Sequence, residues 1–155
     1  MRRRPTKTMI GLIVGLAAFW LAVFVINLNG KSVAGGVVVG RLAPCPETPN
    51  CVSSQTEDAT QLVEPFKLTG DPAAALGKLK AALARLGGTT VVKEETNYLH
   101  AVASTPFFRF RDDLELLIDP TNGVIHVRSA SRIGRSDLGA NRKRVEGMRK
   151  VWEAK

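Results

Sequence analysis

The alternation of apolar and polar positions separates one continuous apolar run from a longer region of mixed periodicity. From Met9 to Leu28 the sequence contains no charged residue and a single asparagine, Asn27. An apolar run of about twenty residues has the length that an α-helix needs to cross the hydrocarbon core of a membrane. This run therefore predicts either one transmembrane helix or a long signal sequence.

Basic residues around the apolar run predict its orientation. The first seven residues carry four positive charges, whereas only Lys31 and Arg41 follow the run closely. Because cytoplasmic flanks are enriched in Lys and Arg, residues 1–30 are expected to form a cytoplasmic basic tip and a signal anchor in the cytoplasmic (inner) membrane. The following domain is then expected in the periplasm or outside the cell. A small-residue pattern ending at Ala34 leaves cleavage there open, although the apolar run is longer than that of most cleaved signals.

A glycine-rich stretch separates the apolar run from the domain. Gly35, Gly36 and Gly40 lie among small apolar residues and show no helical period. This composition predicts a flexible tether over residues 31–42. Residues 43–155 are predicted to form a single extracytoplasmic domain, because their number suits one hydrophobic core.

An amphipathic helix is predicted in the first half of the domain. Asp71-Pro72 supplies an N-cap followed by proline at the first helical position, and Gly87-Gly88 supplies a stop. The leucines between these signals recur at helical spacing and form one apolar stripe. The stripe indicates packing on a core and does not indicate a cofactor site.

Farther along the chain the apolar period changes to two, which is typical of strands. The predicted strands cover residues 89–95, 98–104, 108–118 and 124–130. Pairing across the turn that begins at Asp119 places Glu115 opposite Arg128. The same register places Leu116 opposite Val127, so that the apolar faces of the last two strands coincide.

The chain is predicted to end in a basic amphipathic helix that begins at Ser136-Asp137 and runs to about Glu153. Its apolar stripe consists of Leu138, Val145, Met148 and Trp152. The basic face beside and opposite this stripe is expected to be exposed, and it consists of Arg142, Arg144, Arg149 and Lys150. The predicted fold class is therefore α+β: an antiparallel sheet of about four strands with two helices packed on one face, preceded by one N-terminal transmembrane helix.

The formal net charge of +8 is concentrated in two places. One is the N-terminal tip, and the other is the region from Arg132 onward, where basic residues outnumber acidic ones. The middle of the chain is close to neutral, so the charge does not indicate a nucleic-acid-binding domain. The expected side of the membrane also argues against nucleic acid. Anionic lipid or a membrane protein is a better match for exposed basic residues on a tethered domain.

Two cysteines stand in a proline-rich segment at the start of the domain. Cys45 and Cys51 are separated by five residues and can meet across a short loop. In an oxidising compartment the simplest interpretation is a structural disulfide. A redox-active pair and a metal site are alternatives, but no further Cys or His ligand stands nearby, and we expect no metal and no cofactor. Lipid attachment at Cys45 is disfavoured because Pro44 precedes it.

Two motifs and a short acidic sequence together resemble a known family. The motifs are PCPETPNCVSS at residues 44–54 and RSASRIGRSDLGANRKRVE at residues 128–146, with Asp112, Asp113 and Glu115 between them. They are similar to those of the domain-of-unknown-function family 1499, which contains membrane-anchored or exported proteins of bacteria and plastids. The resemblance covers nearly the whole predicted domain. It implies no activity and no catalytic residues, because the family has none established.

The turn between the last strand and the last helix is the candidate ligand site. The ligand-binding residues expected there are Arg128, Ser131, Arg132, Ser136, Asn141 and Arg142. Their side chains, with the free N–H groups of the helix N-terminus, suit a phosphate, a carboxylate or a lipid headgroup. The alternative is an internal network in which carboxylates fill the same turn, since a carboxylate on an apolar face needs a partner. The expected members of that network are Asp112, Asp113, Glu115 and Asp137.

Catalysis is the weaker hypothesis. Asp112 and Asp113 point to opposite faces of one strand and cannot act together as acid and base. A serine nucleophile would need His100 or His126 within hydrogen-bonding reach, and no Gly-x-Ser-x-Gly motif is present. We therefore expect a membrane-anchored binding or assembly module that recognises an anionic ligand, a lipid headgroup or a membrane-protein partner. The alternative is an envelope enzyme, either a hydrolase or a thiol-disulfide redox protein, and the ligand and the oligomeric state stay open.

Overall fold

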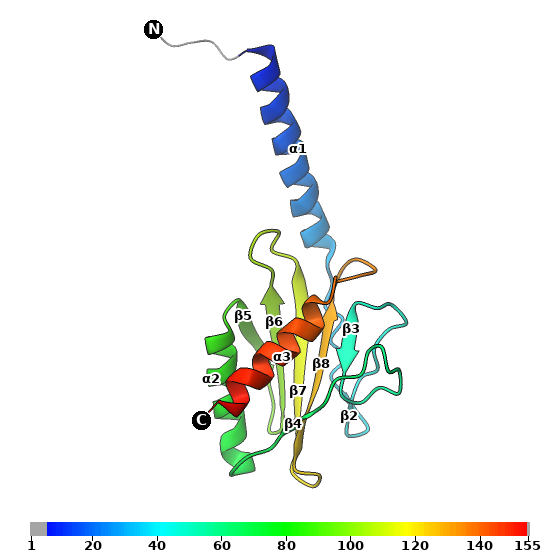
Figure 1. The fold of residues 1–155 in the computed structure, drawn as a ribbon, viewed down its shortest axis with the longest axis vertical. Helices are drawn as coiled ribbons and strands as arrows, with labels where there is room; N and C mark the ends of the chain where they lie inside the picture. Colours follow the sequence, from blue (N-terminus) through cyan, green and yellow to red (C-terminus); the bar gives the residue numbers. More distant parts are fainter. Residues whose placement is uncertain (1–5, 155) are drawn as a thin grey trace. The chain divides into compact units, whose positions relative to one another are not determined.

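The structure is a computed structural model that describes residues 6–154, drawn in Figure 1, and it divides the chain into two compact units, Met1–Gly30 and Lys31–Lys155. The basic tip that we expected at residues 1–5 and the C-terminal Lys155 lie outside the described residues. Each unit has its own internal packing, and the two are described separately below.

The first unit consists of one helix, α1 (Lys7–Asn29). It begins at Thr6, whose hydroxyl accepts a hydrogen bond from the N–H of Met9. Its 23 residues contain an 18-residue window with a mean hydropathy of 2.7, and this window is almost entirely exposed. By length and composition α1 can cross a membrane, which agrees with the predicted span.

The second unit is an α+β domain built on a six-stranded sheet. The strands follow the order β3 (Cys51–Ser53), β8 (Val124–Ser131), β7 (Arg111–Asp119), β6 (Tyr98–Ser104) and β5 (Thr89–Glu94), and β4 (Phe66–Lys67) also pairs with β8. All named neighbours are antiparallel. The sheet has more strands than the predicted four, because β3 and β4 are too short to show an alternating pattern in the sequence.

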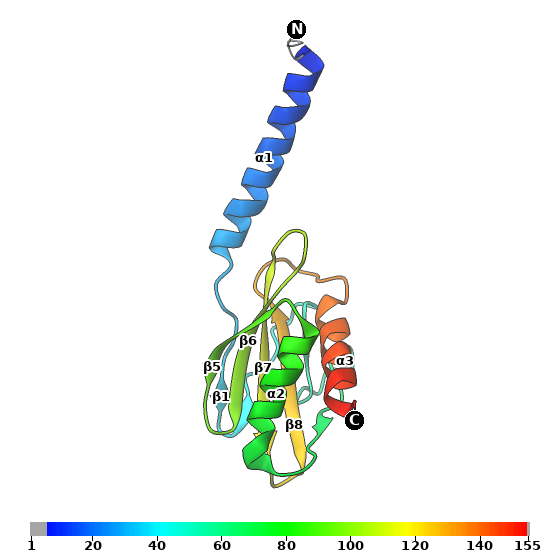
Figure 2. The ribbon, with the colours of Figure 1, turned by 90° about the vertical axis from the view of Figure 1, so that its left-hand side faces the viewer.

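Two helices, α2 (Pro72–Leu86) and α3 (Ala140–Glu153), lie side by side on one face of the sheet (Figures 1 and 2). Asp71 caps α2 as predicted, since its carboxylate accepts from the N–H of Ala73. The core between the helices and the sheet contains Leu79 and Leu83 of α2 and Val145 and Met148 of α3. All four side chains are buried, so the central residues of each predicted apolar stripe pack on the core.

The predicted register of the last two strands is confirmed. Glu115 lies opposite Arg128, and Leu116 lies opposite Val127. Because side chains alternate across a strand, this register sends Leu116 toward the helices and Glu115 toward the other face. One face of the sheet is therefore apolar, and the other carries charged residues.

The strand β7 begins three residues later than predicted, at Arg111. Residues 105–110 form a closed turn in which Thr105 O accepts from the N–H of Arg109, and Thr105 Oγ1 accepts from the N–H of Phe110. Arg109 takes a left-handed conformation with φ 58°. Phe108 and Phe110, which we assigned to a strand, therefore lie in a loop, and the neighbouring Phe107 is 68% exposed.

The last helix also begins later than predicted, at Ala140 after Gly139. The reason is that Asp137 binds the turn from outside the helix: its carboxylate accepts from the N–H groups of Gly139 and Asn141. Leu138 therefore falls in the preceding loop with φ 52° and is 90% exposed. Its predicted place in the apolar stripe is wrong.

Residues 31–43, which we call the strap, are not a free tether. The N–H of Val33 donates to Asp113 and that of Gly36 donates to Glu115, at 2.7 and 2.8 Å. The strap then forms a hairpin of β1 (Val37–Val38) and β2 (Arg41–Leu42), whose Leu42 is buried. The prediction of a flexible tether is wrong because buried carboxylates on the charged face of the sheet bind the strap backbone.

Candidate functional site

Asp113 is the centre of an ion cluster beneath the strap. Its carboxylate lies 2.7 Å from Nε2 of His100 and 2.7 Å from Nη2 of Arg132, and it accepts from the strap N–H of Val33. The side chain is fully buried. Burial raises the pKa of Asp113, but the hydrogen bonds from His100 and Arg132 outweigh burial and hold the pKa well below its usual range. Asp113 is therefore ionised and fully partnered.

Glu115 forms a second cluster two residues along the same strand face. Its carboxylate accepts from Nη1 of Arg128 at 2.7 Å, from the hydroxyl of Tyr98 at 2.7 Å and from the strap N–H of Gly36. Burial and the hydrogen bond to Glu115 raise the pKa of Tyr98 far above its usual range. Of the buried side-chain polar atoms that the structure describes, only Nε of Arg128 lacks a hydrogen-bond partner.

A third cluster lies on the opposite face of the sheet, at the start of α3. Asn141 is fully buried, and its amide donates to Asn50 O and to Ser131 Oγ, both at 2.9 Å. Its side-chain oxygen accepts from Arg144, which also pairs with Asp112. Arg144 is thus the ion-pair partner that a buried carboxylate such as Asp112 needs on the apolar face of the sheet. The sequence predicted the need for this partner but did not identify Arg144.

The six residues predicted to bind a ligand do not meet in one place. Arg128 and Arg132 lie on the strap face with carboxylate partners, whereas Ser131 and Asn141 lie on the helix face. Ser136 accepts from the N–H of Leu138 in the exposed loop that follows. Asp137 already fills the N-terminus of α3. This geometry favours the internal network that the sequence offered as the alternative.

The basic face of α3 was expected to be exposed, which holds for Lys150 but not for the arginines, which are half-buried. Arg142 donates to the carbonyl oxygens of Thr60 and Leu62, at 2.8 Å each. Arg149 donates to the carbonyls of residues 64 and 65, and its guanidinium lies 4.8 Å from the ring centre of Phe66. These arginines attach the long segment between β3 and β4 to the domain. No local sequence pattern predicts this role.

The predicted disulfide is confirmed, since Cys45 and Cys51 are bonded with their Cα atoms 5.7 Å apart. Cys51 is buried in β3 and pairs with Ala130 of β8. The bond therefore attaches the segment after the strap to the edge of the sheet. Within residues 6–154, no group of three His, Cys, Asp or Glu side chains is placed to hold a metal ion.

β6 and β8 end, and β7 begins, at one end of the sheet, which we call the strap end of the domain (Figure 1). The segments at this end carry exposed apolar and basic residues. The strap-end surface is defined as Lys31, Phe107, Phe108, Arg109, Arg135 and Leu138. No carboxylate that the structure describes forms an ion pair with Lys31, Arg109 or Arg135. Sequence reasoning missed this surface because it assigned Phe108 to a strand and Leu138 to a helix.

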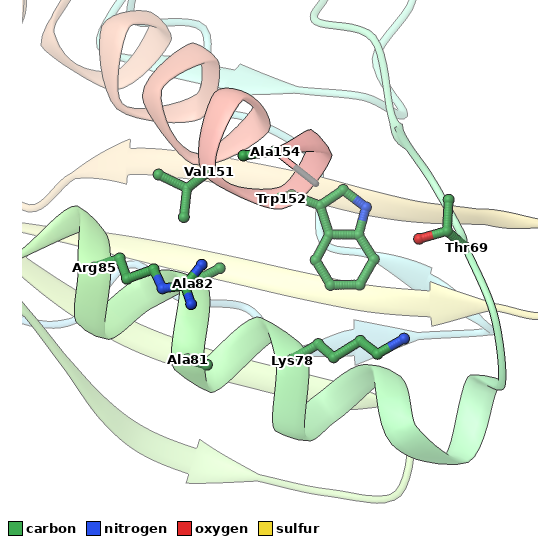
Figure 3. Close-up of a pocket in the computed structure, with 8 residues that line it drawn as sticks. All are labelled: Thr69, Lys78, Ala81, Ala82, Arg85, Val151, Trp152 and Ala154. Carbon is green, nitrogen blue, oxygen red and sulfur yellow. The ribbon is translucent and has the colours of Figure 1, made fainter.

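Hollows lie beside the C-terminus of α2 and between α2 and the end of α3. One, of about 440 Å³, lies at the strap end and is lined by Gly88, Thr89, Thr90, Ser104, Thr105, Pro106 and Arg109. The other, of about 200 Å³, lies between α2 and the last turn of α3, where Lys78, Arg85 and Trp152 point into it (Figure 3). Both contain basic side chains, which makes them candidates for anionic ligands.

One serine does lie beside a histidine, as nucleophilic catalysis would require. Oγ of Ser54 is 3.3 Å from Nδ1 of His126, and Nε2 of His126 is 3.6 Å from Asp119. Burial lowers the pKa of His126, and Asp119 offsets part of that shift. A neutral imidazole can accept a proton from a serine. The sequence indicated that a serine nucleophile would need His100 or His126 nearby. It did not indicate that Ser54 would be the serine beside His126.

The architecture is that of a small α+β domain with helices on one sheet face and a buried ionic network on the other, preceded by one candidate membrane span. The chain belongs to the family described as protein of unknown function (DUF1499), whose profile matches residues 41–151. A search of curated proteins found no match to the chain. The family description assigns no activity, so functional proposals must come from the geometry.

Proposed function

We propose that the protein is a single-span, membrane-anchored binding module whose extracytoplasmic domain contacts the surface of the bilayer through the strap-end surface. The observation that carries this proposal is the bond from Val33 to Asp113. Asn29 ends α1, so four residue steps separate the end of the candidate span from Val33. A fully extended chain covers roughly 14 Å in four steps. The strap end of the domain therefore stays within about that distance of the point where the chain leaves the membrane.

The chemistry of the strap-end surface suits a bilayer interface. Phe107 and Leu138 expose apolar area on separate loops, while Arg109 and Arg135 lie close to them in sequence. Aromatic and aliphatic side chains gain by entering the boundary between headgroups and acyl chains, and nearby cations are attracted to anionic lipid. Each basic residue near such a surface contributes about 1 kcal/mol. Docking of the domain on its own membrane would orient it for a lipid or a membrane-protein partner.

Spin-label accessibility tests this proposal. The full chain is reconstituted in nanodiscs of phosphatidylcholine and phosphatidylglycerol with a label at Leu138→Cys or at Val39→Cys. Val39 is a matched control because it is 96% exposed and apolar with a positive φ, but lies in the turn of the strap hairpin. Leu42 of that hairpin packs on Tyr98, at the opposite end of β6.

The proposal predicts that molecular oxygen reaches the label at position 138 more readily than a water-soluble nickel complex does. The label at position 39 should show the opposite preference. If the nickel complex reaches the labels at positions 138 and 39 equally well, the strap end does not dock on the bilayer. This conclusion does not depend on which ligand the domain binds.

A second candidate function is that of an envelope hydrolase, favoured by the Ser54–His126 contact. In this reaction Ser54 Oγ attacks an ester or amide carbonyl while His126 takes its proton. His126 then gives that proton to the departing alcohol or amine as its bond to the acyl carbon breaks, and water later hydrolyses the acyl-serine and restores the hydroxyl of Ser54. A fluorophosphonate probe should then label Ser54 in the native protein and fail in His126→Gln. Labelling no greater than that of Ser136, an exposed serine, would eliminate the hydrolase.

A further inference from the structure

We propose that the strap-end hollow beside Arg109 binds a phosphate group, supplied by the headgroup of a phospholipid. As a headgroup site this inference rests on the proposed docking of the strap end. It goes further by assigning the ligand group and the side chains that hold it. The hollow lies between Gly88 at the start of β5 and Ser104 at the end of β6, and the loop 105–110 closes it.

Hydroxyl donors line this hollow. The hydroxyls of Thr90 and Ser104 have no hydrogen-bond partner among the described residues, and Thr105 Oγ1 accepts from the N–H of Phe110, which leaves its own proton free to donate. Thr89 is different, because its hydroxyl already donates to Leu83 O. Three hydroxyls are thus available to an oxyanion, whose oxygens are strong acceptors.

Arg109 adds the positive charge. Its guanidinium makes no hydrogen bond or ion pair within residues 6–154, in contrast to Arg132 and Arg144, which bind buried carboxylates. No Asp or Glu lines the hollow, so nothing there competes for the guanidinium fork. A guanidinium with hydroxyl neighbours matches the planar arrangement of donors that phosphate recognition uses.

The backbone fixes Arg109 in this position. Its φ of 58° is uncommon for a residue with a side chain, and the turn is closed by the 3.1 Å bond from its N–H to Thr105 O. Such conformations persist where the surrounding structure determines them, and they cluster at ligand sites. The exposed ring of Phe107 lies two residues away, so the apolar part of a lipid has a contact beside its phosphate.

The other basic hollow is less suited to an anion. It lies at the C-terminal turn of α3, where carbonyl groups give the helix its negative end (Figure 3). Glu153 lines the adjoining part of the same groove, and Trp152 donates its indole N–H to Lys67 O. The strap-end hollow also adjoins a helix C-terminus, that of α2, but no carboxylate lines it, so it is the one that we assign to phosphate.

The test has a lipid arm and a soluble-phosphate arm, both with the full chain. In the first, native mass spectrometry counts the phospholipids retained when the protein leaves phosphatidylglycerol nanodiscs. In the second, calorimetry in maltoside micelles measures binding of inorganic phosphate. The variant is Arg109→Gln, and the matched control is Arg135→Gln, which removes an equally exposed charge from the same end of the domain outside the hollow. Ser104→Ala is a second variant that leaves the loop backbone unchanged.

The inference predicts that one phospholipid is retained by the native protein and by Arg135→Gln, and that Arg109→Gln lowers retention about tenfold or more. Ser104→Ala should lower it less, in the same direction. Equal retention by all four proteins would overturn the site. Binding of inorganic phosphate that depends on Arg109, without lipid retention, would overturn the headgroup assignment. If the label at position 138 still enters lipid in that case, docking survives and only this inference fails.

Discussion

The backbone N–H of Val33 donates a 2.7 Å hydrogen bond to Oδ2 of Asp113, eighty residues farther along the chain. This bond joins the segment that follows α1 to the third residue of β7. It turns what would be a loose linker into a short connection at one end of the sheet. The proposed docking of the strap end on a bilayer depends on this one contact.

Removing the Asp113 carboxylate should destabilise the domain strongly. Asp113→Ala leaves Arg132 and His100 without their buried partner, and loss of one member of a buried pair costs about 3 to 5 kcal/mol. Denaturant unfolding of the full chain measures this loss. Glu94→Ala breaks the exposed pair with Lys80 and is the control, with an expected change of about 0 to 1 kcal/mol. Equal effects of the two substitutions would contradict the burial of this cluster.

The lowered pKa of Asp113 predicts that the domain loses stability at low pH. The pKa of Asp113 is lower in the folded than in the unfolded state, so its contribution is present above the unfolded pKa of about 4 and is lost as pH falls through the folded value. Unfolding free energy measured from pH 6 down to pH 2 should therefore decline. In Asp113→Asn the starting stability is lower and the decline is shallower, because this group no longer titrates. Parallel curves for the two proteins would refute the assignment.

The strap should be sensitive to one added methyl group. A Cβ at Gly35 would lie 2.2 Å from Cβ of Ala43, so Gly35→Ala must displace the strap. Overpacking of this kind costs about 1 to 3 kcal/mol, and hydrogen exchange at Val33 and Gly36 should accelerate. Gly77→Ala is the control: its new Cβ meets no atom within 4 Å, and alanine favours a helix. Unchanged protection at Val33 in Gly35→Ala would show that the strap is not packed as described.

The sequence predicted the register of β7 and β8 because both strands alternate apolar and charged residues with a period of two. A shift by one residue would have set Leu116 opposite a charged side chain, so only one register buries the apolar faces together. The predicted disulfide and the α2 cap succeeded for a similar reason. Each depends on residues close in sequence whose chemistry allows few arrangements.

The strap and the roles of the arginines could not be predicted in this way. The strap donates backbone N–H groups to Asp113 and Glu115, and backbone groups carry no residue-specific signal. Arg142 likewise binds carbonyl oxygens about eighty residues away. Leu138 was misplaced because Asp137 satisfies the helix amides from outside the helix, which delays its start. In each case a long-range or backbone contact overrode a local pattern.

Photo-crosslinking at Leu138 tests the central claim most directly. A benzoylphenylalanine replaces Leu138 or, as the control, Val39, and intact membranes of cells that express the full chain are illuminated before mass analysis. Our account predicts phospholipid adducts at position 138 and none above background at position 39. Adducts to a protein, or no adducts, at position 138 would contradict the claim that this end of the domain lies on lipid.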